Sequence, residues 1–204
     1  MEPHFTSDWF SPHIPVWKEV FAPMEGKPDL HFLEIGSYEG RSACWLLTNV
    51  LTHSSSRLTC IDIFHLSEES IETSTRLNLA MPSGEEIESR FDANIRAVGA
   101  ENKVTKLKGA SRELLRTLPL GSFDCAYVDG SHTSASALID GILCLDLLKT
   151  DGLLVFDDYR WNCFPEAPLK NPGSGIDAFL TFFKDEINII HNDYQVIVRK
   201  TEKR

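Results

Sequence analysis

No stretch of this sequence approaches the roughly 18 consecutive apolar residues that a membrane-spanning helix requires. Its first residues also lack the basic segment and apolar run of a signal peptide. Repeats and low-complexity segments are missing as well, and 204 residues suit one domain of ordinary size. We therefore expect a single domain over residues 1–204, a cytoplasmic location and no membrane partner.

Positive charge is in short supply. The chain has 20 Lys and Arg against 30 Asp and Glu, which gives a formal net charge of -10. Domains that bind nucleic acids usually carry a basic face, and anionic membrane surfaces attract basic segments. Because the basic residues are also scattered, we expect neither kind of partner.

Cysteine is scarce, and its spacing suits neither a disulfide framework nor a zinc site. The cysteines are odd in number and form no Cys-x-x-Cys pair. We expect buried, free thiols. The five residues are Cys44, Cys60, Cys125, Cys144 and Cys163.

What the sequence does contain is an alternation of short apolar runs and segments with helical spacing. Two further runs, 187–190 and 194–198, are separated by so few residues that they must pair antiparallel. The pattern predicts an α/β fold with a doubly wound, seven-stranded, mainly parallel sheet and an antiparallel C-terminal hairpin. The five runs that alternate with helices cover residues 30–35, 57–62, 103–108, 123–128 and 153–156.

Three segments lie outside this alternation. Residues 1–29 form a helical extension whose aromatic side chains pack on the core or form an oligomer interface, such as that of a homodimer. The polar residues 65–86 are expected to form a mobile lid, or else a solvated helical insertion. In the loop at 160–173, Trp161 and Phe164 are candidates for contact with an acceptor.

The first predicted strand ends in a glycine-containing loop that opens a helix. Gly36 and Gly40 leave room for a ligand, and the following helix offers free N–H groups. The acidic Glu39 suits a zwitterionic amino acid better than a phosphate, with Glu34 near the ammonium end. An ordinary strand-to-helix turn is the alternative.

Two later strand ends could complete a nucleoside site. A carboxylate at Asp62 can accept hydrogen bonds from both hydroxyls of a ribose, or it can cap a turn. Ser111 could bond the edge of an adenine ring, or it could be a helix N-cap.

Three carboxylates and an imidazole follow strands four and five. Asp129, Asp157, Asp158 and His132 should converge, because ligands bind beyond the carboxyl ends of such strands. The group could hold a divalent cation such as Mg²⁺, or it could provide a general base, His132 or a carboxylate. Purely structural roles as loop caps are the third possibility.

Taken together, these segments resemble class I S-adenosylmethionine-dependent methyltransferases, which have a Rossmann-like fold. More narrowly, the chain is similar to macrocin-type sugar O-methyltransferases and, more distantly, to catechol O-methyltransferase. The resemblance covers about residues 30 to 200. Its motifs are EIGSYEGRSA (34–43), CIDIF (60–64), FDCAYVDGSH (123–132) and GLLVFDDY (152–159).

The resemblance implies methyl transfer by in-line displacement to a small-molecule acceptor, with oxygen as the expected nucleophile. It also implies that Asp129, Asp157 and Asp158 lie where metal-dependent members hold their cation, and that Asp129 and His132 are the catalytic candidates. Ser134 stands where the narrower group often has an aromatic residue. The segments 65–86 and 160–173, which would shape the acceptor pocket, match nothing in the family, so the resemblance does not identify the acceptor. The residues expected to bind S-adenosylmethionine are Glu34, Gly36, Ser37, Gly40, Asp62 and Ser111.

Two other functions remain open at this stage. A nucleotide-dependent oxidoreductase could use a similar sheet, although the chain lacks the GxGxxG loop and ends in a hairpin. A non-catalytic relative could have kept cofactor binding alone.

Overall fold

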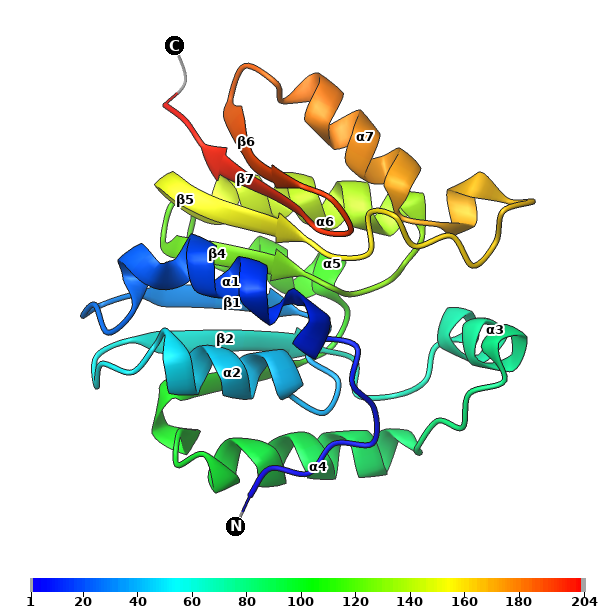
Figure 1. Ribbon diagram of the computed structural model, residues 1–204, viewed down its shortest axis with the longest axis horizontal. Helices are drawn as coiled ribbons and strands as arrows, with labels where there is room; N and C mark the ends of the chain where they lie inside the picture. The colour runs from blue at the N-terminus through cyan, green and yellow to red at the C-terminus, as the bar shows by residue number, and fades with distance from the viewer. Residues whose placement is uncertain (1, 203–204) are drawn as a thin grey trace.

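A seven-stranded sheet runs through the centre of the computed structural model, which describes residues 2–202 (Figure 1). Its strands are ordered β3-β2-β1-β4-β5-β7-β6. The first five are parallel, and β7 pairs antiparallel with β5 and β6. The predicted doubly wound fold with its C-terminal hairpin is confirmed. The strands are β1 (His31–Ile35), β2 (Arg57–Asp62), β3 (Val104–Lys108), β4 (Phe123–Val128), β5 (Leu148–Phe156), β6 (Ile187–Asn192) and β7 (Val196–Lys200).

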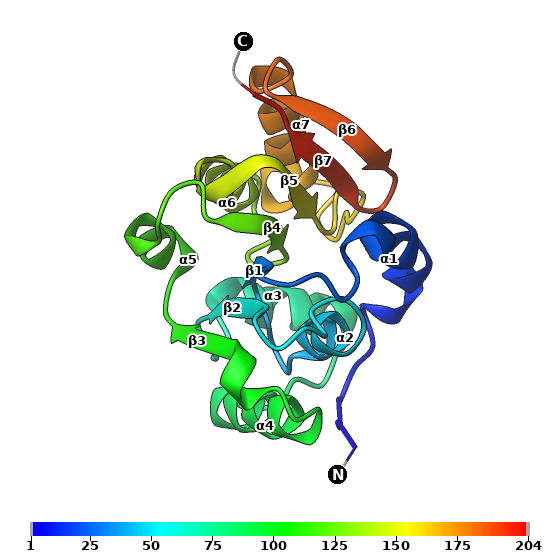
Figure 2. The same ribbon diagram turned by 90° about the vertical axis from the view of Figure 1, so that its left-hand side faces the viewer.

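Helices cover both faces of the sheet, with α1 and α2 on one side and α5 and α6 on the other (Figure 2). Successive side chains of a strand point to opposite faces, so Phe32 joins the core beneath α1 and α2, whereas Leu33 joins the core beneath α6 and α7. The α-helices are α1 (Ile14–Phe21), α2 (Arg41–Asn49), α3 (Glu68–Leu77), α4 (Gly84–Ala97), α5 (Ser111–Leu114), α6 (Ser134–Leu147) and α7 (Gly173–Phe182). Short 3₁₀ helices are η1 (Ser11–His13), η2 (Ala22–Met24), η3 (Glu101–Lys103), η4 (Leu115–Thr117) and η5 (Pro168–Lys170).

Strand β5 is longer than its sequence predicts. The sequence predicts a run over 153–156, yet β5 begins at Leu148 and continues through Gly152, a residue typical of turns. Leu148 pairs with Phe123, and a register shift follows before the regular pairing resumes. The turn residues are thus accommodated as an irregularity inside the strand. The closing hairpin is shifted too, because β6 extends to Asn192 and its turn lies at 193–195.

The polar segment 65–86 contains α3 and the start of α4. Helix α3 is capped by Ser67, and none of its residues is buried. Helix α4 begins at Gly84 because Ser83 and Glu86 form a capping box, in which each side chain accepts a backbone N–H of the other residue. The insertion thus contains α3 and the start of α4, and its expected role as a mobile lid stays a prediction.

The N-terminal extension packs on the chain's own core. Trp17 and Phe21 of α1 are buried, as is Phe10. Trp9 is 53% exposed and lies beside Tyr38 of the glycine loop, with ring centroids 5.5 Å apart.

Within the described residues 2–202, no helix combines the length and apolar character that crossing a bilayer demands. All five cysteines are free thiols, and all but Cys163 are buried. Burial raises the pKa of Cys44 to about 12, so this thiol stays protonated at neutral pH.

Candidate active site

The glycine loop is shaped by the protein's own packing. Gly36 has a φ of +82°, and a Cβ placed on it would lie 1.8 Å from the carbonyl oxygen of Asp129, at the end of β4. Gly40 has a φ of +81°, and its Cβ would lie 2.9 Å from the ring of Phe91 on α4. Gly36 is therefore required by the close approach of the backbone that follows β4, and its contact with a ligand stays a prediction.

Glu34 lies beneath this loop, fully buried. Its carboxylate accepts a hydrogen bond from Ser42 Oγ of α2 at 2.5 Å and one from Cys60 Sγ at 3.5 Å. Burial raises the pKa of Glu34, and the nearby hydroxyls of Ser37 and Ser42 oppose that rise. The side chain supports the start of α2, and its contact with a ligand ammonium stays a prediction.

Asp62 joins the glycine loop to the turn after β2. Its carboxylate accepts the backbone N–H of Tyr38 at 2.8 Å and that of Phe64 at 2.6 Å. Both donors have left-handed backbones, with φ of 49° and 48°. The hydroxyl of Ser37 in the same loop is buried and has no hydrogen-bond partner among the described residues. The Asp62 carboxylate thus fixes the backbone of the glycine loop, whose Ser37 hydroxyl is buried on the side of Glu34 and Cys60.

Ser111 is engaged within the protein. Its hydroxyl lies 2.9 and 3.1 Å from the two carboxylate oxygens of Asp140 on α6. The N-cap of α5 is Ala110, and Ser111 is the first residue of the helix, so the expected capping role is wrong. Contact of Ser111 with an adenine stays a prediction.

The ends of β4 and β5 gather the expected carboxylates around one phenol. The hydroxyl of Tyr127 lies 3.0 Å from Asp129 Oδ2 and also contacts Asp157 Oδ2. Burial and the negative charges of Asp157 and Asp158 raise the pKa of Asp129 well above its usual value. Burial and Asp158 also raise the pKa of Asp157. The cluster therefore favours retaining a proton that isolated carboxylates would lose.

His132 bridges two carboxylates. Its Nε2 lies 2.9 Å from Asp158 Oδ2, and its Nδ1 lies 3.2 Å from Glu69 Oε1. Burial alone would lower the pKa of His132, but the hydrogen bonds to Asp158 and Glu69 outweigh it and raise the pKa well above its usual value. Tyr194 donates to the other oxygen of Asp158 at 2.8 Å. Both ring nitrogens of His132 are thus occupied by carboxylates, an arrangement that favours the imidazolium form.

Part of this cluster has the geometry of a cation site. Asp129, His132 and Asp158 each offer a donor atom, and these atoms lie within 4.8 Å of one another. Asp157, which we expected among the ligands, lies outside the group and accepts the N–H of Asp158 at 2.8 Å. The enclosed space beside them is about 10 Å³, close to the room that one water molecule needs.

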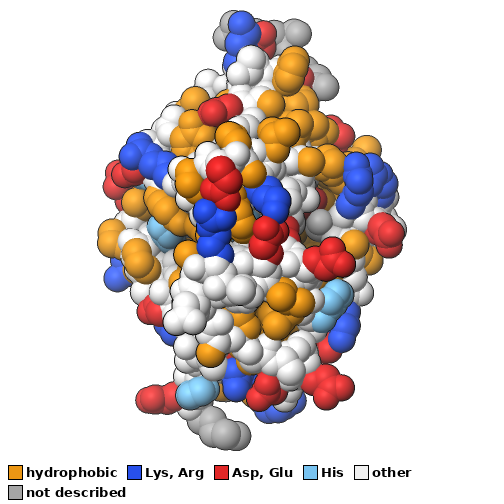
Figure 3. Space-filling model, turned by 90° about the vertical axis from the view of Figure 1, so that its right-hand side faces the viewer, with side chains coloured by type: hydrophobic (Ala, Val, Ile, Leu, Met, Phe, Trp, Pro, Cys, Tyr) orange, Lys and Arg blue, Asp and Glu red, His pale blue; other side chains and the backbone are white. Residues whose placement is uncertain are grey.

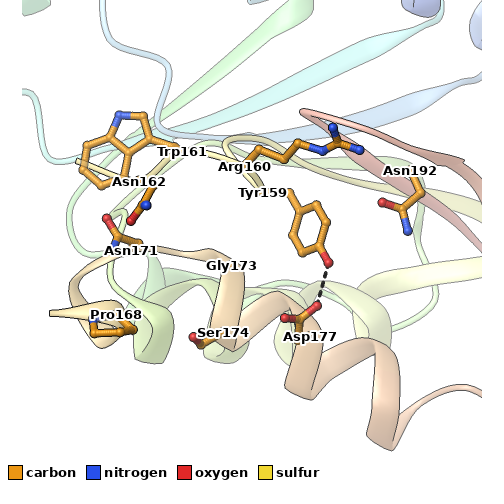
Figure 4. A pocket seen from close by; sticks show the side chains of 10 residues that line it. All are labelled: Tyr159, Arg160, Trp161, Asn162, Pro168, Asn171, Gly173, Ser174, Asp177 and Asn192. Carbon is orange, nitrogen blue, oxygen red and sulfur yellow. Dashed lines mark hydrogen bonds between the residues drawn. The ribbon is translucent and has the colours of Figure 1, made fainter. Parts of the chain in front are cut away.

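A larger cavity of about 510 Å³ opens between the loop after β5 and the start of α7 (Figure 4). Tyr159 points into it and donates to Asp177 Oδ1 at 2.7 Å. The wall is mostly polar and includes amide side chains, together with the indole of Trp161. That indole also stacks on His132, with centroids 4.8 Å apart, so the cavity and the acidic cluster share a wall. Phe164, expected at such a surface, is 2% exposed and belongs to the core of the loop.

Glu69 is the site residue that the sequence did not single out. It lies on α3, 63 positions from His132, in a segment rich in glutamate. Only its place after the N-cap Ser67, in the first turn of a helix in the insertion, distinguished it. Nothing local indicated that it would reach β4.

Comparison with known proteins points to one family. The family model described as a methyltransferase domain matches residues 33–159. No curated protein matches the chain.

Solved structures of similar fold include several methyltransferases. The O-methyltransferase TomG from Streptomyces achromogenes, in complex with SAM, has a TM-score of 0.66 at 14% identity, over 96% of this chain and 82% of that one. An O-methyltransferase from Bacillus cereus, in complex with SAH, has a TM-score of 0.67 at 15% identity, over 97% and 84%. A putative rRNA-methylase from Clostridium thermocellum has a TM-score of 0.68 at 11% identity, over 98% and 100%. Likenesses this distant in sequence describe the fold.

Proposed function

This chain belongs to the methyltransferase-domain family, and we propose that it transfers the methyl group of S-adenosylmethionine to a hydroxyl oxygen of a polar small molecule. Membership makes it a class I methyltransferase that depends on this donor. The nature of the acceptor is the proposal. The observation that carries it is the cluster of Asp129, His132 and Asp158, which can accept a proton or hold a cation beside a polar cavity.

The donor fits the ends of β1 and β2. When bound, S-adenosylmethionine supplies an activated methyl group on a positively charged sulfur. The Asp62 carboxylate suits ribose hydroxyls, and the unpaired hydroxyl of Ser37 would gain a partner from a polar ligand at this loop.

Asp129 is the base that the arrangement favours. When it is ionised, Asp129 takes a proton more readily than an ordinary carboxylate, because burial beside Asp157 and Asp158 raises its pKa. The same shift means that Asp129 must first lose the proton that the cluster favours before it can act as the base. His132 can act as a base only after Asp158 or Glu69 releases a ring nitrogen. In the arrangement described here, the hydroxyl proton passes to a carboxylate oxygen of Asp129, while His132 keeps Asp158 in place.

A polar acceptor suits the cavity. Its wall offers hydroxyl, amide and carboxylate groups beside the rings of Tyr159 and Trp161. Rings provide apolar contact and the polar groups fix orientation. The indole of Trp161 separates the cavity from His132, so an acceptor oxygen must pass this ring to reach Asp129.

A divalent cation also fits. The carboxylates of Asp129 and Asp158 are ligands for hard cations, and the imidazole of His132 completes a three-donor set. A cation held there would make the acceptor hydroxyl easier to deprotonate.

Calorimetric titration of the chelated protein with Mn²⁺ and with Mg²⁺ tests the cation. Binding should disappear in Asp129→Asn and Asp158→Asn but survive in Asp157→Asn, whose side chain lies outside the donor set. Full activity after exhaustive chelation, with no metal found by elemental analysis, would exclude a role for a cation in the reaction. Asp129 would then act as the base without a metal.

A labelled-methyl assay tests the acceptor class. The protein is incubated with S-adenosylmethionine carrying an isotopic label on its methyl group, and with matched sets of polyols and sugars, phenols, amines, thiols and ribosomal RNA. Label in a polyol, sugar or phenol supports the proposal, and label confined to an amine, thiol or RNA contradicts it. Tight binding of S-adenosylhomocysteine without any transfer would indicate a non-catalytic relative.

A further inference from the structure

We propose that Glu69, carried by α3 of the insertion at 65–86, is the residue that positions His132. The inference rests on the proposed function, because it assigns the partner of a residue in that site. Helix α3 lies at the right of Figure 1, apart from the sheet. Its side chains reach from there to the loops that follow the strands.

Glu69 binds the loop after β4 through three contacts. Its Oε1 accepts the backbone N–H of His132 at 2.6 Å and lies 3.2 Å from His132 Nδ1. Its Oε2 accepts the hydroxyl of Ser131 at 2.5 Å. One carboxylate therefore fixes both the backbone and the ring of the same histidine.

The position of the ring decides what His132 can do. Whether Nε2 takes a proton or binds a cation, it must face Asp129 and Asp158. A carboxylate on Nδ1–H fixes the tautomer and the orientation of an imidazole in both cases. Trp161 stacks on the ring and limits its tilt, but stacking does not distinguish the two orientations that a half-turn about the Cβ–Cγ bond exchanges. Glu69 supplies the missing restraint.

Glu69 moves with α3, and α3 is tied to the loop that lines the cavity. Glu72 pairs with Lys170 at 2.6 Å, and Arg76 pairs with Glu166 at 2.5 Å. Figure 3 views this side of the molecule, where acidic and basic side chains lie next to one another. Exposed pairs of this kind contribute little stability each, so these two pairs hold α3 to the loop only weakly. His132 is then correctly oriented only while α3 is docked.

The experiment compares Glu69→Ala and Glu69→Gln with Glu68→Ala. Glu68 is the preceding residue on the same helix, is exposed, and contacts neither Ser131 nor His132. Nitrogen-15 NMR of the histidine rings reports the tautomer and hydrogen bonding of His132, and the His132→Gln spectrum identifies its signals. Hydrogen exchange reports the His132 backbone amide. Neither measurement requires an acceptor.

In Glu69→Ala the His132 ring signals should move to solvent-like values and its amide should exchange faster. Glu69→Gln, which keeps an acceptor oxygen, should recover part of both, and Glu68→Ala should match the wild type. Ring and amide signals that stay unchanged in Glu69→Ala would overturn the proposal.

Activity supplies a second readout. With an acceptor from the labelled-methyl assay, kcat should fall about 10–100-fold in Glu69→Ala, the usual effect of losing an orienting partner, while S-adenosylhomocysteine affinity is kept. The loss should vanish when His132 is already replaced by alanine, because the two residues act as one unit. An equal loss in that background would make Glu69 merely structural. Failure of the wild type to bind S-adenosylhomocysteine would refute the proposed function. The NMR and hydrogen-exchange measurements would still test whether Glu69 positions His132.

Discussion

Replacing Gly36 by alanine tests whether the glycine loop is shaped by packing. A left-handed backbone costs a residue other than glycine about 1–2 kcal/mol, and Gly36 has a φ of +82°. The new Cβ would lie 1.8 Å from the carbonyl oxygen of Asp129, which belongs to the backbone and cannot rotate away. Forcing a carbon into such a site adds about 1–3 kcal/mol. The free energy of unfolding should fall by about 2–5 kcal/mol, and Tm by about 4–20 °C.

Gly99→Ala is the matched control. Gly99 also has a left-handed backbone, with a φ of +68°, but a Cβ there would meet nothing within 4 Å. It should lose only the backbone cost of about 1–2 kcal/mol. Urea unfolding of both variants without ligand measures the difference. Equal losses would refute the packing argument and return Gly36 to a role in ligand approach.

Two further predictions concern single carboxylates. Asp62→Ala should weaken S-adenosylmethionine binding by about 1–3 kcal/mol, the scale of hydrogen bonds to a charged group, and unchanged affinity by calorimetry in a folded variant would contradict the ribose assignment. Burial raises the pKa of Asp140 to about 6 from an ordinary 3.8, so the folded protein binds this proton more tightly than the unfolded chain. The resulting stabilisation is complete below pH 3.8 and is lost as the pH rises through 6. The loss in the free energy of unfolding is about 3 kcal/mol. Measured by urea unfolding from pH 4 to 7, this free energy should depend less on pH in Asp140→Asn than in the wild type, and an equal dependence would refute the assignment.

The strands of the sheet, though not their order, could be predicted from residues that are local in sequence. Apolar runs such as 57–62 and 123–128 marked their strands to the residue, because a buried parallel strand is continuously apolar. The start of β5 was missed, since Gly152 is typical of a turn, whereas the strand continues through it back to Leu148, which pairs with Phe123.

The sequence indicated which residues gather at the ends of β4 and β5, but not which side chains hydrogen-bond with them. The topology predicts that Asp129 and Asp158 lie near each other, because both follow neighbouring parallel strands. The choice of Tyr127 as their shared partner depends on side-chain direction, and Glu69 arrives from an insertion whose path no local pattern fixes. Gly36 was correctly singled out, but its reason lies in a backbone contact more than ninety residues away.

Transfer of a labelled methyl group to a hydroxyl acceptor, measured in the wild type and in Asp129→Asn, tests the central claim most directly. Asp146→Asn, on an exposed position of α6, is the control. We predict that the wild type and the control transfer the label to oxygen, and that Asp129→Asn binds S-adenosylhomocysteine normally but loses about 10²–10⁴-fold in rate, the usual contribution of a general base. Transfer to oxygen at an undiminished rate in Asp129→Asn would contradict the account.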